Sequence, residues 1–259
     1  MKTITLLCLF AAAVCAQTIE PLTSGGRIKP EAAVLTGGEI VVPELILGGE
    51  WTSSIRLVNQ TGFPVSKTAV YFFDNNGQPM VTTFRTSAGS VVTDVGFTFN
   101  LFVGGMLEGV FQGGANVQFG HAVIASTLTP GLYGEVTLTN HNSTRPDFQS
   151  VFPFEQPAPL QYLCFDGRNG FTTTLYVVNE NVNAQTISMD VRDGVNNLLR
   201  TVALPLPALG SGIYTLHAIA PETIGIQGTL VFRTGALATV TSLRINPTNS
   251  FTPVRTFVP

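Results

Sequence analysis

The chain has 259 residues, of which 13 are Lys or Arg and 16 are Asp or Glu, and its formal net charge is −3. Charged residues make up only 11% of the sequence, well under half of the roughly 25% usual in soluble domains. So few basic residues exclude a protein that binds nucleic acid by neutralising phosphates. So little charge also excludes a coiled coil or an acidic disordered chain.

Residues 1–16 have the layout of a secretory signal peptide. One positive charge precedes an apolar run at 3–14, and small residues stand before Gln17 at the positions that a signal peptidase reads. The run is too short to span a bilayer as a helix. Cys15 leaves lipid attachment as an alternative, which we do not favour because a lipoprotein signal needs a residue smaller than Val14 before the cysteine. We therefore expect cleavage before Gln17.

Residues 17–36 are interpreted as an N-terminal extension of the mature protein. Signal cleavage would leave Cys164 as the only cysteine, so no disulfide within the chain is expected. Its apolar neighbours, Leu163 and Phe165, predict a buried and unreactive thiol. No later stretch is apolar enough for a membrane-spanning helix. The sequence thus predicts an extracellular or periplasmic protein without a membrane span or a lipid anchor.

Two segments of the chain resemble each other at an offset of 120 residues. Residues 51–59, WTSSIRLVN, align with residues 171–179, FTTTLYVVN. Weaker matches occur upstream and downstream in the same order, which chance does not readily explain. They predict two homologous domains, residues 37–156 and 157–259, each near the usual size of a domain. Prolines at the junction predict a stiff, short linker.

Both copies show the alternation of polar and apolar residues that is typical of half-buried strands. Such runs lie at 54–58, 68–73, 95–101, 122–126, 134–138, 174–178, 186–191, 228–232 and 237–243. Turn-forming residues separate them at 74–77, 104–105, 113–114, 129–131, 193–194 and 210–212. Short strands without crossover helices predict an all-β chain of two tandem antiparallel Ig-like β-sandwich domains after the signal peptide. One barrel built from both copies is the alternative.

Each copy opens with an aromatic residue, continues with a Thr/Ser-rich alternating strand that ends in Val-Asn, and then has an Asp…Gly hairpin. This pattern, at 51–77 and 171–194, resembles exported bacterial tandem-repeat proteins with Ig-like β-sandwich modules. The residues that carry the resemblance are packing and turn residues. The resemblance implies a sandwich fold and an exported location. Because such modules are largely uncharacterised, it implies no catalytic residue.

No pattern in the sequence points to catalytic or metal chemistry. A Gly-x-Ser-x-Gly turn that would expose a nucleophilic serine is absent, and so is a phosphate-binding Gly-rich loop. The three histidines and Cys164 include no pair at ligand spacing. His121 falls within a strand pattern, and we interpret it as a bystander. The sequence therefore predicts no catalytic residue, no metal ligand and no cofactor.

The acidic residues suggest a less favoured hypothesis, namely that the protein is a glycoside hydrolase, because glycosidases use two carboxylates on β-scaffolds. The candidates are scattered, and most fall at turns, where Asp bonds its own backbone; they are Glu50, Asp74, Asp94, Glu108, Glu135, Asp166, Asp190, Asp193 and Glu222. Segments 74–77 and 190–194 could also offer oxygen ligands to Ca²⁺. Each has fewer acidic ligands than a calcium loop needs, so we predict hairpin turns there.

Aromatic side chains are the remaining clue to a ligand, since carbohydrate-binding sandwiches expose flat rings. The weak binding candidates are Trp51, Tyr71, Tyr133 and Tyr214. Trp51 and Phe171 take the same place in both copies, which favours packing over a sugar platform. We expect a secreted, non-catalytic protein with a structural, adhesive or protein-binding role; a carbohydrate-binding module is the alternative. Its partner would be a protein or glycan surface and not nucleic acid, and the oligomeric state stays open.

Overall fold

The computed structural model describes residues 19–22, 39–125, 131–144, 146–234, 238–248 and 250–259. The predicted signal peptide, residues 1–16, lies outside the described residues. Regular structure in the described part is nearly all β and forms four antiparallel sheets. An α-helix occurs there only as the single turn α1 (Leu216–Ile219). The prediction of an all-β, antiparallel sandwich fold is confirmed.

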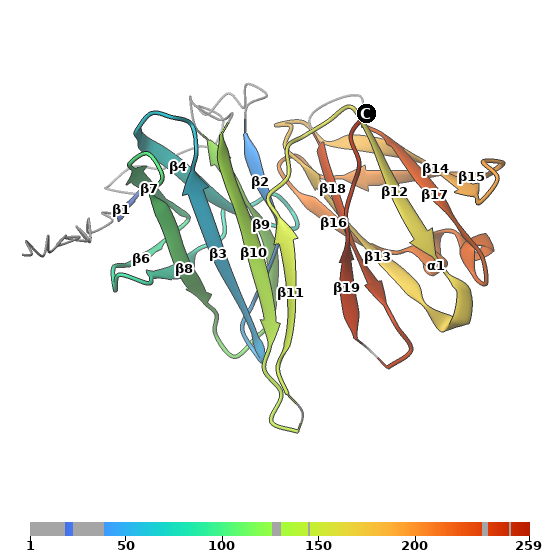
Figure 1. Ribbon diagram of the computed structural model, residues 1–259, viewed down its shortest axis with the longest axis horizontal. Coiled ribbons are helices and arrows are strands. Elements are labelled where there is room, and N and C mark those ends of the chain that lie inside the picture. The colour runs from blue at the N-terminus through green and yellow to red at the C-terminus, as the bar shows by residue number, and fades with distance from the viewer. Residues whose placement is uncertain (1–18, 23–38, 126–130, 145, 235–237, 249) are drawn as a thin grey trace, which may run out of the picture.

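The first two sheets pack face to face (Figure 1). One has the strand order β1-β7-β4-β9-β2, and the other has the order β11-β10-β3-β8-β5-β6. The strands are β1 Ile19–Pro21, β2 Ile40–Leu47, β3 Trp51–Asn59, β4 Val65–Asp74, β5 Thr82–Thr86, β6 Val91–Asp94, β7 Gly96–Leu101, β8 Met106–Gln112, β9 Gln118–Ala125, β10 Leu132–Asn140 and β11 Phe148–Pro153. We call β1–β11 the first half. Part of the expected extension 17–36 is thus a strand, β1, paired with β7.

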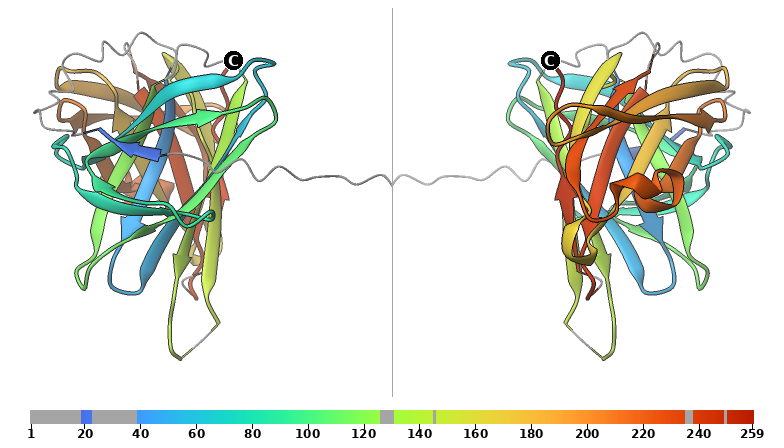
Figure 2. Two further views of the ribbon diagram at one scale, coloured as in Figure 1. Left: turned by 90° about the vertical axis from the view of Figure 1, so that its left-hand side faces the viewer. Right: turned by 90° about the vertical axis from the view of Figure 1, so that its right-hand side faces the viewer.

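The other two sheets form the second half, β12–β19, with the orders β12-β17-β14-β15 and β16-β13-β18-β19. The strands are β12 Leu160–Asp166, β13 Thr172–Asn179, β14 Gln185–Asp193, β15 Leu198–Leu206, β16 Ser211–Thr215, β17 Gln227–Arg233, β18 Ala238–Ile245 and β19 Phe251–Val254. The order β2-β9-β4-β7 recurs as β12-β17-β14-β15, and the order β8-β3-β10-β11 recurs as β16-β13-β18-β19. In Figure 2 the β10–β11 hairpin reaches beyond the other strands.

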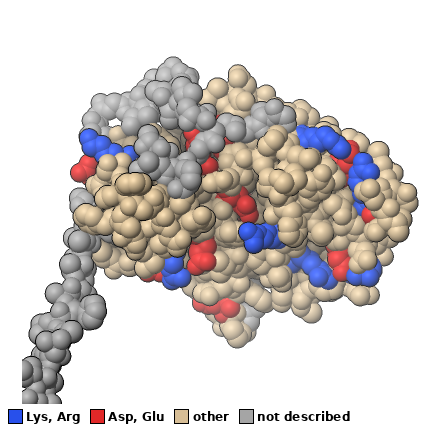
Figure 3. Space-filling view, turned by 45° about the horizontal axis from the view of Figure 1, so that its top comes forward, with Lys and Arg blue, Asp and Glu red and all other residues tan. Residues whose placement is uncertain are grey.

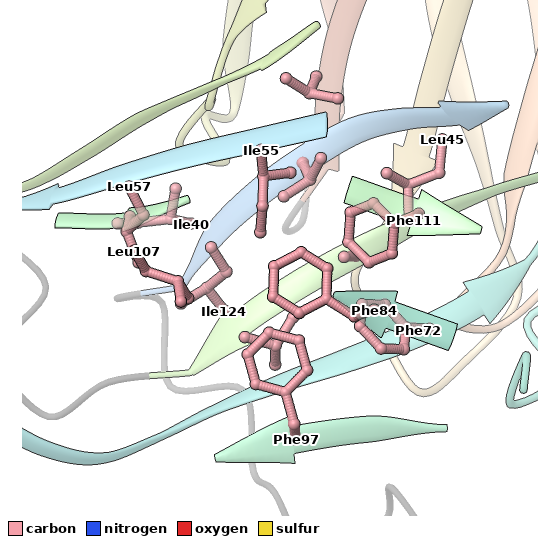
Figure 4. Close-up of a cluster of buried hydrophobic side chains, with 14 of the residues drawn as sticks. Ile40, Leu45, Ile55, Leu57, Phe72, Phe84, Phe97, Leu107, Phe111 and Ile124 are labelled. Carbon is pink, nitrogen blue, oxygen red and sulfur yellow. The ribbon is translucent and has the colours of Figure 1, made fainter. Parts of the chain in front are cut away.

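Four phenylalanine rings fill the centre of the first half (Figure 4). Phe84 and Phe97 stack with ring centroids 4.8 Å apart. Phe111 lies 4.8 Å from Phe84 and meets Phe72 edge-on at 5.3 Å. Phe72 and Phe97 come from one sheet, and Phe84 and Phe111 come from the other. All four are at most 1% exposed, so aromatic packing joins the two sheets.

Buried asparagines hold the loops at the same end of both halves. Asn59 ends β3, and its Oδ1 accepts the backbone N–H two residues later at 3.0 Å. Its Nδ2 donates to the carbonyls of Phe63, at 2.7 Å, and Phe102, at 3.1 Å. Asn179 ends β13 and repeats this set, accepting the N–H two residues later and donating to the carbonyls four residues later and of Pro207. Each asparagine side chain therefore connects two loops, and each of these loops runs from one sheet to the facing sheet.

Replacing either asparagine by alanine is expected to lower the free energy of unfolding by about 2–4 kcal/mol, since several buried backbone groups lose their partners at once. Urea unfolding of Asn59→Ala and Asn179→Ala measures this cost. Asn142→Ala is the matched control, because Asn142 caps Thr144 in the same way but on the exposed surface. A cost for the buried variants no larger than that of the control would contradict the loop-holding role.

Strand β2 joins the two halves, and all eight of its residues are buried. It pairs with β9 and also contacts β13 and β18 of the second half. Tyr176 and Leu243, from β13 and β18, belong to the hydrophobic core of the first half. The Tyr176 ring meets Phe152 edge-on at 6.3 Å, and Trp51 stacks on Phe251 at 6.1 Å. We call this shared region of β2, β11, β13 and β18 the seam.

A tight turn of the first half, Asp74–Gln78, makes a second contact with the second half. Ser211 donates its backbone N–H to the carbonyl of Asn75 at 3.0 Å and its hydroxyl to the Oδ1 of Asn75 at 2.9 Å. Gly77 has a φ of 77°, and a side chain there would collide with the carbonyl of Ala208. The turn therefore needs glycine both for its conformation and for this close approach.

Candidate functional site

The four aromatic candidates lie in different parts of the molecule. Trp51 is partly buried against the core at one end of β3, and Tyr133 lies beside the other end of β3. Tyr71 is half-buried on β4. Tyr214, on β16, donates its hydroxyl to the carbonyl of Pro205 at 2.8 Å. The structure does not gather these side chains into one site, and of the four only Tyr133, 61% exposed, is open to solvent.

Tyr133 borders a cavity of about 500 Å³ where the two halves meet. We call this cavity the seam pocket. Its lining residues also include Phe154 and the polar residues Glu155, Gln156 and Arg255. The volume is within the range of small-molecule sites, which combine ring surfaces with a few polar groups. These polar groups can accept and donate hydrogen bonds to a hydroxylated ligand.

The backbone around the seam pocket is held by hydrogen bonds that join β2 and β10 to the residues directly after β11. Glu155 exchanges two backbone hydrogen bonds with Val41, at 2.8 and 3.0 Å. The N–H of Phe154 donates to the carbonyl of Gly134 at 2.8 Å, and the Phe154 ring fills the place where a side chain at 134 would stand. Burial raises the pKa of Glu155 to about 7, although the positive charge of Arg255 opposes the shift. Burial therefore favours the protonated form of Glu155, one of the residues that line the pocket.

The outer face of the first half is the side of β3, β8 and β10 that points away from the core. Its side chains are Ser54, Arg56, Val58, Met106, Glu108, Val110, Tyr133, Glu135 and Thr137. Arg56 lies between two of the predicted carboxylate candidates, with Glu108 at 2.8 Å and Glu135 at 3.2 Å. All three side chains are substantially exposed, and they are direct cross-strand neighbours. The two carboxylates thus share one arginine on an open surface.

Most of the other acidic candidates make local hydrogen bonds or ion pairs. Hydrogen bonds from Arg168 lower the pKa of Asp166 to about 2, and a bond from Arg233 lowers the pKa of Asp190. Asp74 and Asp193 each accept two backbone N–H groups of their own turns, and Asp94 accepts the next N–H along the chain. Glu222 lies 3.6 Å from Arg200, and Glu50 is exposed. In Figure 3 acidic and basic groups sit beside one another, separated by wide uncharged areas.

His121 is fully buried on β9, where it stacks on Phe73 with ring centroids 5.5 Å apart. Burial lowers its pKa to about 3, so the ring is neutral, and neither ring nitrogen has a partner among the described residues.

Cys164 is exposed, so the prediction of a buried thiol is wrong. Leu163 and Phe165 point into the core, and strand alternation therefore turns Cys164 outward.

Buried carboxyl groups at the seam were not predicted from the sequence. Glu44 lies at the β2 bulge, is 1% exposed and has one carboxyl oxygen without a partner in the described part of the chain. Glu180 accepts the Thr239 hydroxyl at 2.7 Å. Burial raises the pKa of Glu44 well above its usual range and the pKa of Glu180 to about 8. Burial also raises the pKa of Tyr176, with a contribution from Glu44. Burial therefore favours the protonated form of both carboxyls.

Within the described ranges, no three His, Cys, Asp or Glu side chains lie close enough together to hold a metal ion. The same part of the chain has no helix with the length and apolar character needed to cross a membrane. No family model, curated protein or solved structure matches this chain.

Proposed function

We propose that this protein is exported and serves as a non-catalytic scaffold of two tandem sandwich domains, residues 37–156 and 157–259, with a structural, adhesive or protein-binding role. The observation that carries the proposal is the seam, where Tyr176 and Leu243 complete the core of the first half. A shared apolar core holds two sandwiches in one orientation, unlike the polar interfaces of domains that move. The recurring strand order supports the division into two copies.

The state of the candidate carboxylates supports a role without catalysis. A general acid needs a carboxyl that stays protonated near the working pH, but ion pairs with arginine favour the charged form. Glu108 and Glu135 share Arg56, and Asp166 and Asp190 have lowered pKa values beside arginines. Glu108 and Glu135 also lie on the open outer face of the first half, where water has access to both carboxylates.

Export and the absence of catalysis are tested on the full chain produced in a bacterial host. We expect the protein outside the cytoplasm with Gln17 as its first residue, which N-terminal sequencing would identify. A cytoplasmic, unprocessed chain would contradict export.

For catalysis, the purified protein is incubated with a panel of glycosides beside the variants Glu108→Gln and Glu135→Gln. Turnover that wild type shows and either variant loses would overturn the non-catalytic role.

The seam pocket favours a second candidate function, a carbohydrate-binding module. A glycan array would test it, with Tyr133→Ala and Arg255→Ala as the variants, since both residues line the pocket. Saturable binding by wild type that is lost in both variants would support this function. Array binding that neither substitution changes, or no saturable binding at all, would remove it.

A further inference from the structure

Both halves of the molecule contribute residues to the seam pocket. Ile40 and Tyr133 belong to β2 and β10 of the first half, and Glu155 directly follows its last strand, β11. Arg255 follows β19, the last strand of the second half. Among the described residues that line the cavity, Arg255 is the one that carries a positive charge. The second half therefore brings a cation to a cavity that is otherwise formed mainly by the first half.

Arg255 differs from most arginines of this protein because it forms no ion pair with a described residue. Carboxylates pair with Arg56, Arg168, Arg192, Arg200, Arg233 and Arg244. Within the described ranges Arg85 also lacks such a pair, but it lies on β5 and does not line the pocket. A guanidinium that is not held by a carboxylate of the protein can bind a carboxylate of a ligand through two parallel hydrogen bonds.

Glu155, the acidic residue of the lining, neutralises Arg255 only in part. The positive charge of Arg255 acts on the Glu155 carboxyl and opposes the rise of its pKa, but burial has the larger effect and favours the protonated form. A protonated carboxyl donates a hydrogen bond, which an ionised one cannot do. The pocket therefore keeps positive charge that is available to an anionic ligand.

Comparison of the two copies indicates that the shared fold needs neither charged residue. The bridges from β2 to Glu155 and from β12 to Phe257 take equivalent places in the two halves. Phe257 is thus the counterpart of Glu155, and Pro153 is the counterpart of Arg255, two residues earlier in each copy. The register of the last two strands gives the same equivalence. Because an uncharged residue serves at both places in the other copy, the charges of the pocket favour a role in binding.

Other residues of the lining suit the ring and the hydroxyl groups of a sugar. Tyr133 is exposed, and an aromatic ring offers a flat apolar surface on which a sugar ring can pack. Gln156 is exposed as well, and its carboxamide both donates and accepts hydrogen bonds. A sugar that also carries a carboxylate would use the free cation of Arg255, which a neutral sugar leaves without a partner.

We propose that the seam pocket binds a uronic acid, a sugar whose carboxylate pairs with Arg255 while its ring and hydroxyl groups contact Tyr133 and Gln156. The inference rests on the second candidate function, carbohydrate binding, and names the class of sugar. A bond between a guanidinium and a carboxylate is stronger than one between neutral groups, so this pair determines which sugars bind. Because the ligand contacts both halves, binding also stabilises the folded chain.

Isothermal titration calorimetry tests the inference with oligosaccharides of galacturonate, glucuronate and mannuronate and with their uncharged methyl esters. Wild type is expected to bind at least one acidic oligosaccharide, and to bind its ester about tenfold more weakly or worse, because the ester lacks the charge. Arg255→Gln is expected to lose a similar factor toward the acid and little toward the ester. Arg85→Gln is the matched control, since Arg85 is also exposed and forms no ion pair with a described residue.

The outcomes separate the class of sugar from carbohydrate binding itself. Equal affinity of wild type for acid and ester, or unchanged affinity of Arg255→Gln for the acid, would overturn the acidic class. Equal weakening by Arg85→Gln would also overturn it, because the effect would then come from net charge alone. Wild type that binds neutral glycans but none of the acidic oligosaccharides would remove the acidic class and leave the carbohydrate-binding function. Absence of saturable binding to any glycan would remove both.

Discussion

Leu243→Asp is expected to divide the thermal unfolding of this protein into two transitions. Leu243 belongs to β18 of the second half, but its side chain is 5% exposed within the core of the first half. A carboxylate there has no partner and costs several kcal/mol to bury, which the protein avoids by opening the seam. Wild type is expected to unfold in one transition because the halves share a core. Differential scanning calorimetry distinguishes the two patterns.

Ile213→Asp is the matched control for the seam variant. Ile213 lies on β16 of the same sheet and is 38% exposed, so a carboxylate there remains in contact with water. The control is expected to keep one transition with a small change in midpoint. A single transition for Leu243→Asp, merely moved to lower temperature, would show that the halves stay coupled without the seam.

The free energy of unfolding is expected to decrease as pH rises from about 4.5 to about 8. The pKa of Glu155 is raised to about 7, that of Glu180 to about 8, and that of Glu44 is raised well above its usual range. Between the usual pKa of a glutamate and these values, the folded chain keeps protons that the unfolded chain has released, so rising pH favours unfolding. His121 acts in the opposite direction. Because its pKa in the folded protein is lowered to about 3, the folded protein loses stability as the pH falls below the usual pKa of a histidine.

Glu180→Gln is expected to remove much of this pH dependence. The carboxamide keeps an oxygen for the Thr239 hydroxyl but cannot ionise, so the variant gains several kcal/mol over wild type at pH 8 and little at pH 5. Urea unfolding across this pH range measures the slope. Glu222→Gln, which changes a more exposed carboxylate beside Arg200, is the control for the substitution itself. Parallel curves for wild type and Glu180→Gln would refute the assignment.

The sequence predicts strands well where one face is polar. The alternating runs at 54–58 and 174–178 fall within β3 and β13, and the turn at 74–77 is observed. Strand β8 was missed because Val110 and Met106 are apolar on the outer face while Gly109 points inward and makes room for Phe84. Alternation disappears when both faces carry apolar residues or when an inward position is glycine.

The positions of the candidate site residues depend on tertiary contacts that periodicity does not contain. Glu44 and Glu180 look like ordinary surface acids in the sequence, and only the packing of the second half on β2 buries them. The offset of 120 residues would place Val41 opposite Gln161, but the bridges from Val41 to Glu155 and from Tyr162 to Phe257 make Val41 and Tyr162 equivalent. A shift of one residue exchanges the two faces of a strand. The bulge in β2 causes the displacement.

The burial of β2 on every side also determines when the chain can finish folding. Residues that cover this strand, such as Tyr176 and Leu243, are made long after Ile40–Leu47. Until they arrive, β2 offers an apolar surface and an incompletely covered sheet edge, the features that promote aggregation of partly folded chains. Contacts so distant in sequence also slow folding. A chain that is synthesised or threaded from its N-terminus is therefore most vulnerable during the interval between making β2 and making β18.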